Sequence, residues 1–275
     1  MAKKKYIAHE YGVAKGGKNL RDDMPRGRVG RIFSTSFFVF AIVISFSLIA
    51  FTIVFFYSAV NGPSMMMELN PRYTVVGDTD AVIVNRHRTP ERGDVIVTRF
   101  YNPDGRQELF VKRLIAKGGD SLYFQRHALT QQTAGGRSFW YEIHLNGIPL
   151  DESAYLDPDI GQNVNYSQIW RYLNGFRHES RYADFIHHNE ERNRWEIVIP
   201  HGYVFYIGDN RGGSGTTDEL RRMSRDSTFF GPQPAEWVMG VVTDVIGEGD
   251  GLFGFIIGYF WNTFVHVITF RWIWG

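Results

Sequence analysis

Ser64 is a candidate nucleophile, because it follows closely after a segment that could lie in a membrane. Ser64 stands in Gly62-Pro63-Ser64-Met65-Met66-Met67, a few residues after a long uncharged apolar segment. Any reaction at Ser64 would therefore take place at a bilayer surface. Because a hydroxyl is a poor nucleophile until a base takes its proton, a nucleophilic Ser64 requires a base elsewhere in the chain.

Histidine and lysine are the two kinds of base to consider. The spacing of His178, His187, His188 and His201, in or beside a polar stretch, favours surface or loop positions over a catalytic triad or a metal site. Lys112 lies inside an apolar, β-branched run. An ordinary lysine, with a pKa of about 10.4, is neutral in only about one molecule in 2,500 at pH 7, and burial can lower that pKa by several units. Since a lysine in such a run is more often a charge at a strand edge, Lys112 alone does not decide the question.

The apolar segment before Ser64 is predicted to anchor the chain in a membrane. Residues 32–60 carry no charge and would form a helix of about 43 Å, against about 30 Å of hydrocarbon. The segment is too long for the core of a cleaved signal peptide, so we expect an uncleaved anchor from which Phe55 to Val60 continue as an extended segment into Ser64. Residues 1–31 hold nine Lys and Arg against three Asp and Glu, which predicts a cytoplasmic tail and an exported body.

The exported body reads as short strands separated by turns. The turns contain Gly77-Asp78, residues 90–93 and residues 102–105, and no helical period of useful length accompanies them. The β-branched or aromatic runs lie at residues 74–76, 81–84, 94–100, 109–115, 195–199, 203–207 and 237–242. Residues 121–194 are less regular, and we interpret them as a smaller inserted lobe. The apolar residues 252–274 are expected either to span the membrane a second time or to lie at its interface.

Composition excludes several other classes. A net charge of +1 argues against nucleic-acid binding by the whole chain, which needs a concentrated basic surface. The absence of cysteine excludes disulfides and thiolate metal ligands. We expect neither a cofactor nor a metal ion.

Four short motifs stand in order behind this anchor: Gly62-Pro63-Ser64-Met65, Arg92-Gly93-Asp94-Val95, Lys112-Arg113-Leu114-Ile115 with Gly119-Asp120, and Gly208-Asp209-Asn210-Arg211. Together they resemble the successive boxes of the bacterial type I signal peptidases, which are membrane-bound Ser/Lys proteases. A further segment, Asn146-Gly147 with Leu150, Glu152 and Tyr155, is also similar. The similarity runs, with gaps, from the anchor to about Gly240.

The resemblance implies a mainly β fold: a coiled antiparallel signal-peptidase β-sheet with a smaller inserted β lobe, preceded by a transmembrane helix. The expected parts are a basic tail (1–31), an anchor (32–60), a catalytic β domain (61–120 and 195–250), the inserted lobe (121–194) and an apolar C-terminal segment (251–275).

The resemblance also implies roles for individual residues. Ser64 would be the acylating nucleophile, Lys112 its general base, and the backbone N–H of Ser64 an oxyanion donor. Gly62 stands where some relatives carry a hydroxyl donor. The residues expected to support the site are Gly62, Met65, Asp209, Asn210, Arg211 and Asp226.

The sequence departs from the family pattern at three places. Met67-Glu68 replaces a usual Pro-Thr in the turn after Ser64. The last motif is split by about ten residues, 215–223, so that either Ser224, which the spacing slightly favours, or Ser214 would orient the lysine amine. Thr228 replaces a final Arg, so an ion pair with Asp226 would be lost or supplied by Arg225 or Arg211.

The expected function is a membrane-bound endopeptidase that removes signal peptides from exported preproteins by cleavage after small residues, of the Ala-x-Ala type. It would lie in the bilayer of the bacterial cytoplasmic membrane, single-pass, or two-pass if 252–274 spans, with its catalytic domain on the exported side. The alternatives are a self-cleaving Ser/Lys protease and a catalytically inert, exported β-rich interaction module.

Overall fold

The protein begins, in the part that the structure describes, with one long helix. The computed structural model describes residues 28–60, 62–65, 69, 80–101, 104–128, 139–156, 165–175, 181–211 and 226–246. Helix α1 (Arg28–Val54) contains, from Ser34 to Val54, the one described stretch long and apolar enough to cross a membrane. That stretch has neither Gly nor Pro, and Ser45 and Ser47 each donate their hydroxyl to the carbonyl four residues earlier. No polar group of these two side chains is thus left to face lipid.

The chain leaves the helix where the sequence predicted. Strand β1 (Phe55–Ala59) follows Val54 directly, so the extended segment expected at Phe55 to Val60 is confirmed. The chain forms two compact units, Met1–Phe51 and Thr52–Gly275, and the second contains β1 and the other strands that the structure describes.

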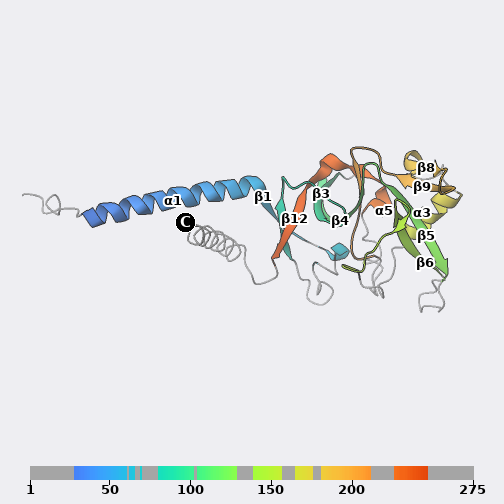
Figure 1. Cartoon of the computed structure of the whole chain (residues 1–275), viewed down its shortest axis with the longest axis horizontal. Helices are drawn as coiled ribbons and strands as arrows, with labels where there is room; N and C mark the ends of the chain where they lie inside the picture. The colour runs from blue at the N-terminus through green and yellow to red at the C-terminus, as the bar shows by residue number, and fades with distance from the viewer. Residues whose placement is uncertain are drawn as a thin grey trace, which may run out of the picture. The chain divides into compact units, whose positions relative to one another are not determined.

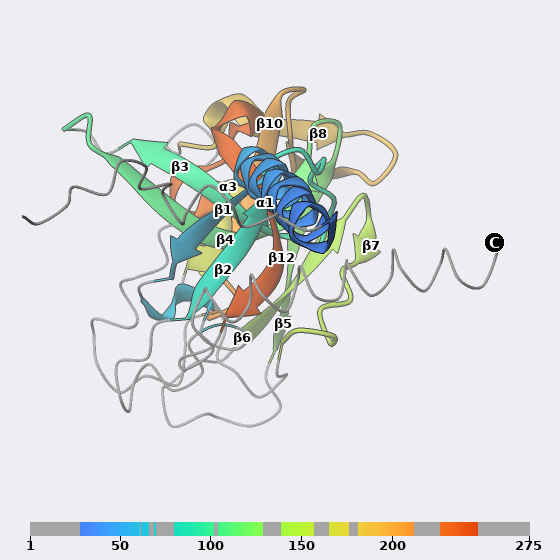
Figure 2. The ribbon, with the colours of Figure 1, turned by 90° about the vertical axis from the view of Figure 1, so that its left-hand side faces the viewer.

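A seven-stranded antiparallel sheet forms the larger part of the second unit. Its strand order is β1-β2-β12-β3-β4-β10-β11, and Figure 2 shows β2 between β1 and β12. Gly240 lies at a register shift of β12, where an added Cβ would collide with the backbone of Asn85. The other strands of this sheet are β2 (Ala81–Asn85), β3 (Val95–Tyr101), β4 (Gln107–Lys117), β10 (Tyr203–Ile207), β11 (Gln233–Pro234) and β12 (Val238–Ile246).

A five-stranded antiparallel sheet forms the smaller part, in the order β7-β6-β5-β9-β8. Helix α3 (Asn165–Asn174) lies beside it (Figure 1) and buries Tyr166, Ile169 and Leu173 in the same core as Phe124. The strands are β5 (Ser121–Ala128), β6 (Phe139–Leu145), β7 (Ile148–Pro149), β8 (Ile186–Asn189) and β9 (Arg194–Val198). The remaining short elements are η1 (Pro63–Met65), η3 (Ala183–Phe185), α5 (Ser227–Phe230) and η4 (Ala235–Trp237).

The prediction of a mainly β fold with an N-terminal apolar helix is confirmed, but residues 121–194 are more regular than expected. Strands β5 and β6 pair over seven residues each, and α3 was not predicted. Strand β9, which the sequence analysis grouped with 195–250, pairs with β5 and β8 in the smaller sheet. The predicted strand at 74–76 and the C-terminal segment 252–274 lie outside the described residues.

Two apolar clusters hold the two sheets together and fix the segment around Ser64. The first joins the two sheets, because Ile115 and Phe205 of the larger sheet pack in one core with Leu122, Phe124 and Ile197 of the smaller. The second packs the segment around Ser64 onto the larger sheet. It consists of Val60, Met65 and Leu69 with Val82, Val84, Val95, Val97 and Val111.

Candidate active site

Ser64 is held by its neighbours and by a distant loop. It lies in the single turn η1, and the side chain of the next residue, Met65, is fully buried in the valine cluster. The carbonyl oxygen of Ser64 accepts a hydrogen bond from the backbone N–H of Asn210 at 3.0 Å. Gly208 lies so close that an added Cβ would collide with that carbonyl oxygen. Burial of Met65 and the loop 208–210 thus fix the backbone on which the hydroxyl stands.

Lys112 reaches Ser64 from a central strand. Strand β4 lies between β3 and β10, and only 3% of Lys112 is exposed, so it is not a charge at a strand edge. Its Nζ lies 2.5 Å from Ser64 Oγ and donates a second hydrogen bond to the Val111 carbonyl at 2.9 Å. The centroid of the Phe110 ring lies 5.5 Å from Nζ. A buried amine and a half-buried hydroxyl are therefore in direct contact.

Burial makes this amine a usable base. It lowers the pKa of Lys112 to about 8, against an opposing attraction from the carboxylates of Asp226 and Asp209. At pH 7 a group with that pKa is neutral in roughly one molecule in ten, instead of one in several thousand. The site therefore supplies a substantial population of free amine within hydrogen-bonding distance of a serine hydroxyl.

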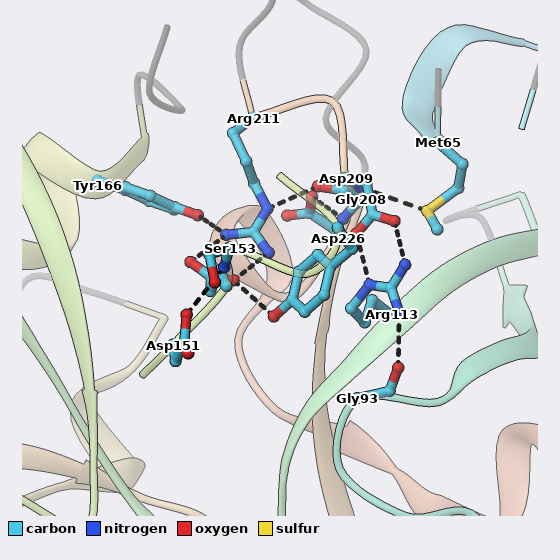
Figure 3. A network of polar contacts seen from close by, with 12 residues as sticks. Met65, Gly93, Arg113, Asp151, Ser153, Tyr166, Gly208, Asp209, Arg211 and Asp226 are labelled. Carbon is cyan, nitrogen blue, oxygen red and sulfur yellow. Dashed lines mark hydrogen bonds and ion pairs between the residues drawn. The ribbon is translucent and has the colours of Figure 1, made fainter. Parts of the chain in front are cut away.

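An ion pair buried beneath the site fixes the loop that contacts Ser64. Arg113, next to Lys112, donates from Nε and Nη2 to the two carboxylate oxygens of Asp209 at 2.8 and 2.6 Å. Its third nitrogen donates to the Gly93 carbonyl at 2.7 Å (Figure 3). The N–H of Asp209 points to the sulfur of Met65 at 3.4 Å. Asp209, a predicted supporting residue, is thus connected to both Lys112 and Ser64 through their sequence neighbours.

The other end of the same loop is held from the smaller lobe. Arg211 Nε donates to the Gly208 carbonyl at 2.9 Å, while its Nη atoms donate to both carboxylate oxygens of Glu152 at 3.1 and 2.5 Å. Nη1 also donates to the hydroxyl of Tyr166 at 2.8 Å. No role was predicted from the sequence for Arg113, Glu152 or Tyr166. Glu152 was visible only as part of a family-like segment.

Asp226 begins helix α5 and contacts the same loop. One carboxylate oxygen accepts from the Thr228 N–H at 3.0 Å and from the Thr228 hydroxyl at 2.5 Å, and the other accepts from the Gly208 N–H at 3.2 Å. Thr228 thus hydrogen-bonds the carboxylate for which the resemblance implied an arginine partner. The guanidinium of Arg211 binds Glu152 instead, and Arg225 lies outside the described residues.

Several predicted residues have other placements. Gly62 is buried with a φ of 115°, a conformation that glycine adopts readily. Ser214, Ser224, Met67, Glu68 and the insert 215–223 lie outside the described residues. Of the candidate histidines, His188 bonds Glu190 on the smaller lobe. Within the described ranges, no group of three or more His, Cys, Asp or Glu side chains could hold a metal ion.

Arg92 of the second motif contacts Asp120 of the third, at a place distinct from the Ser64–Lys112 contact. Asp120 accepts hydrogen bonds from Arg92, from the N–H of Lys117 and from Asn146 Nδ2. The amide oxygen of Asn146 in turn accepts from the Ser121 N–H at 2.9 Å. These contacts connect the turn before β3, the β4–β5 turn and the β6–β7 turn. Arg92 of the second motif and Asp120 of the third therefore help to join the two sheets.

The order of these parts agrees with a family comparison. The model of the family described as signal peptidase, peptidase S26 matches residues 32–246, which contain most of α1, both sheets and the Ser64–Lys112 contact. The chain belongs to the signal peptidase S26 family. This S26 family member is therefore a serine peptidase that cleaves signal peptides.

The chain is similar to a signal peptidase I from each of two bacteria. Signal peptidase I of Aquifex aeolicus (strain VF5) is 29% identical over 200 residues, which are 65% of this chain and 71% of that protein. The crystal structure of a signal peptidase I from Enterococcus faecalis V583 is similar at 20% identity and a TM-score of 0.28, covering 57% of this chain and 98% of that one.

Proposed function

We propose that this S26 peptidase is a membrane-anchored endopeptidase that removes N-terminal signal peptides from exported preproteins with Ser64 as nucleophile and Lys112 as general base. The observation that carries the proposal is the 2.5 Å contact between Lys112 Nζ and Ser64 Oγ, with the amine buried. Contact between base and nucleophile is the geometry that such a dyad requires.

The proposed reaction has two halves. Neutral Lys112 takes the proton of Ser64 as Oγ bonds to the scissile carbonyl carbon, and the resulting ammonium gives that proton to the leaving amine as the peptide C–N bond breaks. The signal peptide is then held as an ester on Ser64. Lys112, neutral again, takes a proton from a water molecule that attacks the ester carbon, and returns it to Ser64 Oγ as the ester C–O bond breaks.

The backbone N–H of Ser64 is the proposed donor to the oxyanion that forms in each half. Glycine at position 62 brings no side-chain donor. Any second donor must therefore come from another group. The loop 208–210 contributes by holding the Ser64 carbonyl, so that the N–H and the hydroxyl of this residue keep their direction.

The substrate is proposed to reach the site from the membrane. In the sequence only four residues separate Ala59, the end of β1, from Ser64, so the serine follows the anchor closely along the chain. The basic residues 1–31 favour a cytoplasmic tail and a site on the exported side. The preprotein would lie extended beside the segment leading into Ser64, with small side chains before the scissile bond, of the Ala-x-Ala type. We also propose that residues 61–120 and 195–250 form the catalytic part and 121–194 its smaller lobe, except that β9 (Arg194–Val198) pairs within the sheet of the smaller lobe.

An acylating active-site probe tests the nucleophile. The full-length protein in detergent micelles is expected to take up one label per chain, located at Ser64 by peptide mass spectrometry, and Ser64→Ala is expected to take up none. A preprotein reporter assayed in parallel should be cut by the wild-type protein only. Labelling at another residue would contradict the assignment. Cleavage confined to the chain itself would favour a self-cleaving protease, and absence of both label and cleavage would favour an inert module.

The pKa of Lys112 predicts the pH dependence of the reaction. Since only the neutral amine can accept a proton, kcat/KM is expected to rise about tenfold per pH unit in acid, to reach half its maximum near pH 8 and to level off above about pH 9. The measurement is initial cleavage of a signal-peptide substrate from pH 5 to pH 10, with intrinsic fluorescence to verify that the protein stays folded. A half-maximum near pH 6.5, where an ordinary histidine titrates, would contradict a lysine base.

A further inference from the structure

Two arginines hold the loop 208–210, and one short segment of the smaller lobe contacts both of them. Arg211 binds the carbonyl of Gly208, and Arg113 binds the carboxylate of Asp209. The segment 150–156, which follows β7, brings Glu152 to Arg211 and Tyr155 to Arg113. The part of the chain that contacts the Ser64 backbone is therefore held by residues that belong to the other sheet's lobe.

The contacts on the Arg211 side form a continuous path to the nucleophile. The Glu152 carboxylate accepts two hydrogen bonds from the guanidinium, whose Nε holds the Gly208 carbonyl. Two residues on, the Asn210 N–H donates to the carbonyl of Ser64. Figure 3 shows Arg211 extending from this loop toward Tyr166, with Asp209 and Arg113 on its other side. The steps are hydrogen bonds between buried or partly buried groups, joined by the backbone from Gly208 to Asn210, so a shift at Glu152 is expected to reach Ser64.

The same carboxylate is fixed from its own segment. The hydroxyl of Tyr155 donates to Glu152 Oε1 at 3.0 Å, and the ring of Tyr155 lies 3.9 Å from the Arg113 guanidinium carbon. Glu152 therefore has a defined place relative to both arginines, and Arg211 has little freedom to choose another partner.

We propose that Glu152 is a positioning residue for the peptidase reaction: acting through Arg211, it places the loop 208–210 and thereby sets Ser64 Oγ against Lys112 Nζ. This inference rests on the proposed Ser64–Lys112 mechanism. Buried ion pairs contribute little net stability, because desolvation offsets the attraction, but they favour one arrangement over others. A displacement of about 1 Å at a reacting atom is enough to reduce a rate by about 100-fold. The main effect of Glu152 is therefore expected on turnover.

Glu152→Gln tests the proposal because it keeps the size of the side chain and removes its charge. We expect kcat per titrated Ser64 to fall by about 10- to 100-fold, with KM changed less than about threefold. The titration uses the acylating probe on the full-length protein, and turnover is measured with a preprotein reporter well below the unfolding temperature. A residue that served stability alone would lower the number of titratable sites and leave the turnover of each unchanged.

Glu196→Gln is the matched control. Glu196 is a buried glutamate of the smaller sheet that accepts hydrogen bonds from Arg192 and Arg194, both at 2.8 Å. Glu196→Gln likewise removes a negative charge next to two guanidinium groups, but these arginines lie on β9 and in the turn before it. We expect wild-type kcat per titrated Ser64 in this variant. An equal fall of kcat in Glu152→Gln and Glu196→Gln would overturn the proposal.

A double variant tests whether Glu152 acts through Arg211. If Glu152 acts through Arg211, Glu152→Gln should reduce kcat much less in an Arg211→Met background than in the wild type. Independent effects would multiply and contradict the proposal.

Tyr166→Phe is a milder variant for the case that Glu152→Gln does not fold. It removes only a hydroxyl bonded to Arg211, and the expected fall in kcat is about 3- to 10-fold. Wild-type kcat in both Glu152→Gln and Tyr166→Phe would overturn the inference. Failure of the wild-type protein to label at Ser64 would instead overturn the proposed mechanism.

Discussion

Replacement of Lys112 by methionine is expected to reduce cleavage of a preprotein by at least about 1,000-fold while leaving the protein folded. Methionine fills nearly the same volume and removes the amine that contacts Ser64 Oγ. Without that amine nothing takes the Ser64 proton in the first step, and no group activates water in the second. The loss should appear in kcat, because the substrate contacts proposed for the site do not involve Lys112.

The same substitution should make the protein more stable below pH 8. Burial holds the pKa of Lys112 at about 8, below the ordinary value of 10.5, so between those two pH values the unfolded chain binds more protons than the folded one. Stability of the wild type therefore rises with pH across this window. Below pH 8 the full cost of charging a buried amine, about 3 kcal/mol, opposes folding, and it disappears above pH 10.5. In Lys112→Met that pH-dependent cost is absent.

Lys117→Met is the control for both effects, because Lys117 lies on the same strand and is partly exposed. Thermal or denaturant unfolding of the full-length proteins in detergent micelles should give a difference between Lys112→Met and wild type that shrinks as the pH rises from 8 to 10.5. Activity of Lys117→Met should stay near that of the wild type. Equal activity of the two variants, or a stability difference that does not change with pH, would contradict the role given to Lys112.

The sequence could predict the strands and the anchor because their signals are local. An uncharged run, β-branched runs and turn residues identified α1, β1 to β4, β9, β10 and β12 within a few residues. The smaller lobe gave weaker signals. Strand β5 carries polar and charged residues such as Gln125 and Arg126 within its length, and helix α3 is short. Their regularity comes from pairing and packing with partners that local patterns do not reveal.

The site itself depends on contacts between residues far apart in the sequence. Whether Lys112 is an exposed charge or a buried base depends on β4 having neighbours on both sides, and one of them, β10, lies some ninety residues later. The sequence alone left this open, and only the family resemblance favoured a base. The pairing of Glu152 with Arg211 likewise depends on how two lobes meet. Residue types at each position were visible, but which acid faces which base was not.

Replacement of Arg113 by methionine is expected to have the largest effect on stability. The Arg113–Asp209 pair is almost wholly buried, with 7% and 0% of the two side chains exposed, and the substitution leaves the Asp209 carboxylate in place without its guanidinium partner. Breaking a buried pair from one side typically costs about 3–5 kcal/mol. Because Asp209 belongs to the loop that contacts Ser64, activity should fall as well, by about 10- to 100-fold at a temperature where the protein remains folded.

Arg88→Met is the control that distinguishes the effect of losing a buried ion pair from that of losing an exposed one. Arg88 pairs with Asp94 at 2.7 Å, but 45% of its side chain is exposed, so its removal should change the free energy of unfolding by less than about 1 kcal/mol. The double variant Arg113→Met with Asp209→Asn should recover part of the stability lost in Arg113→Met, since no uncompensated carboxylate remains buried. Unfolding curves of all four proteins in the same micelles measure these differences. Similar losses of unfolding free energy in Arg113→Met and Arg88→Met would contradict the conclusion that the buried Arg113–Asp209 pair fixes the loop that contacts Ser64.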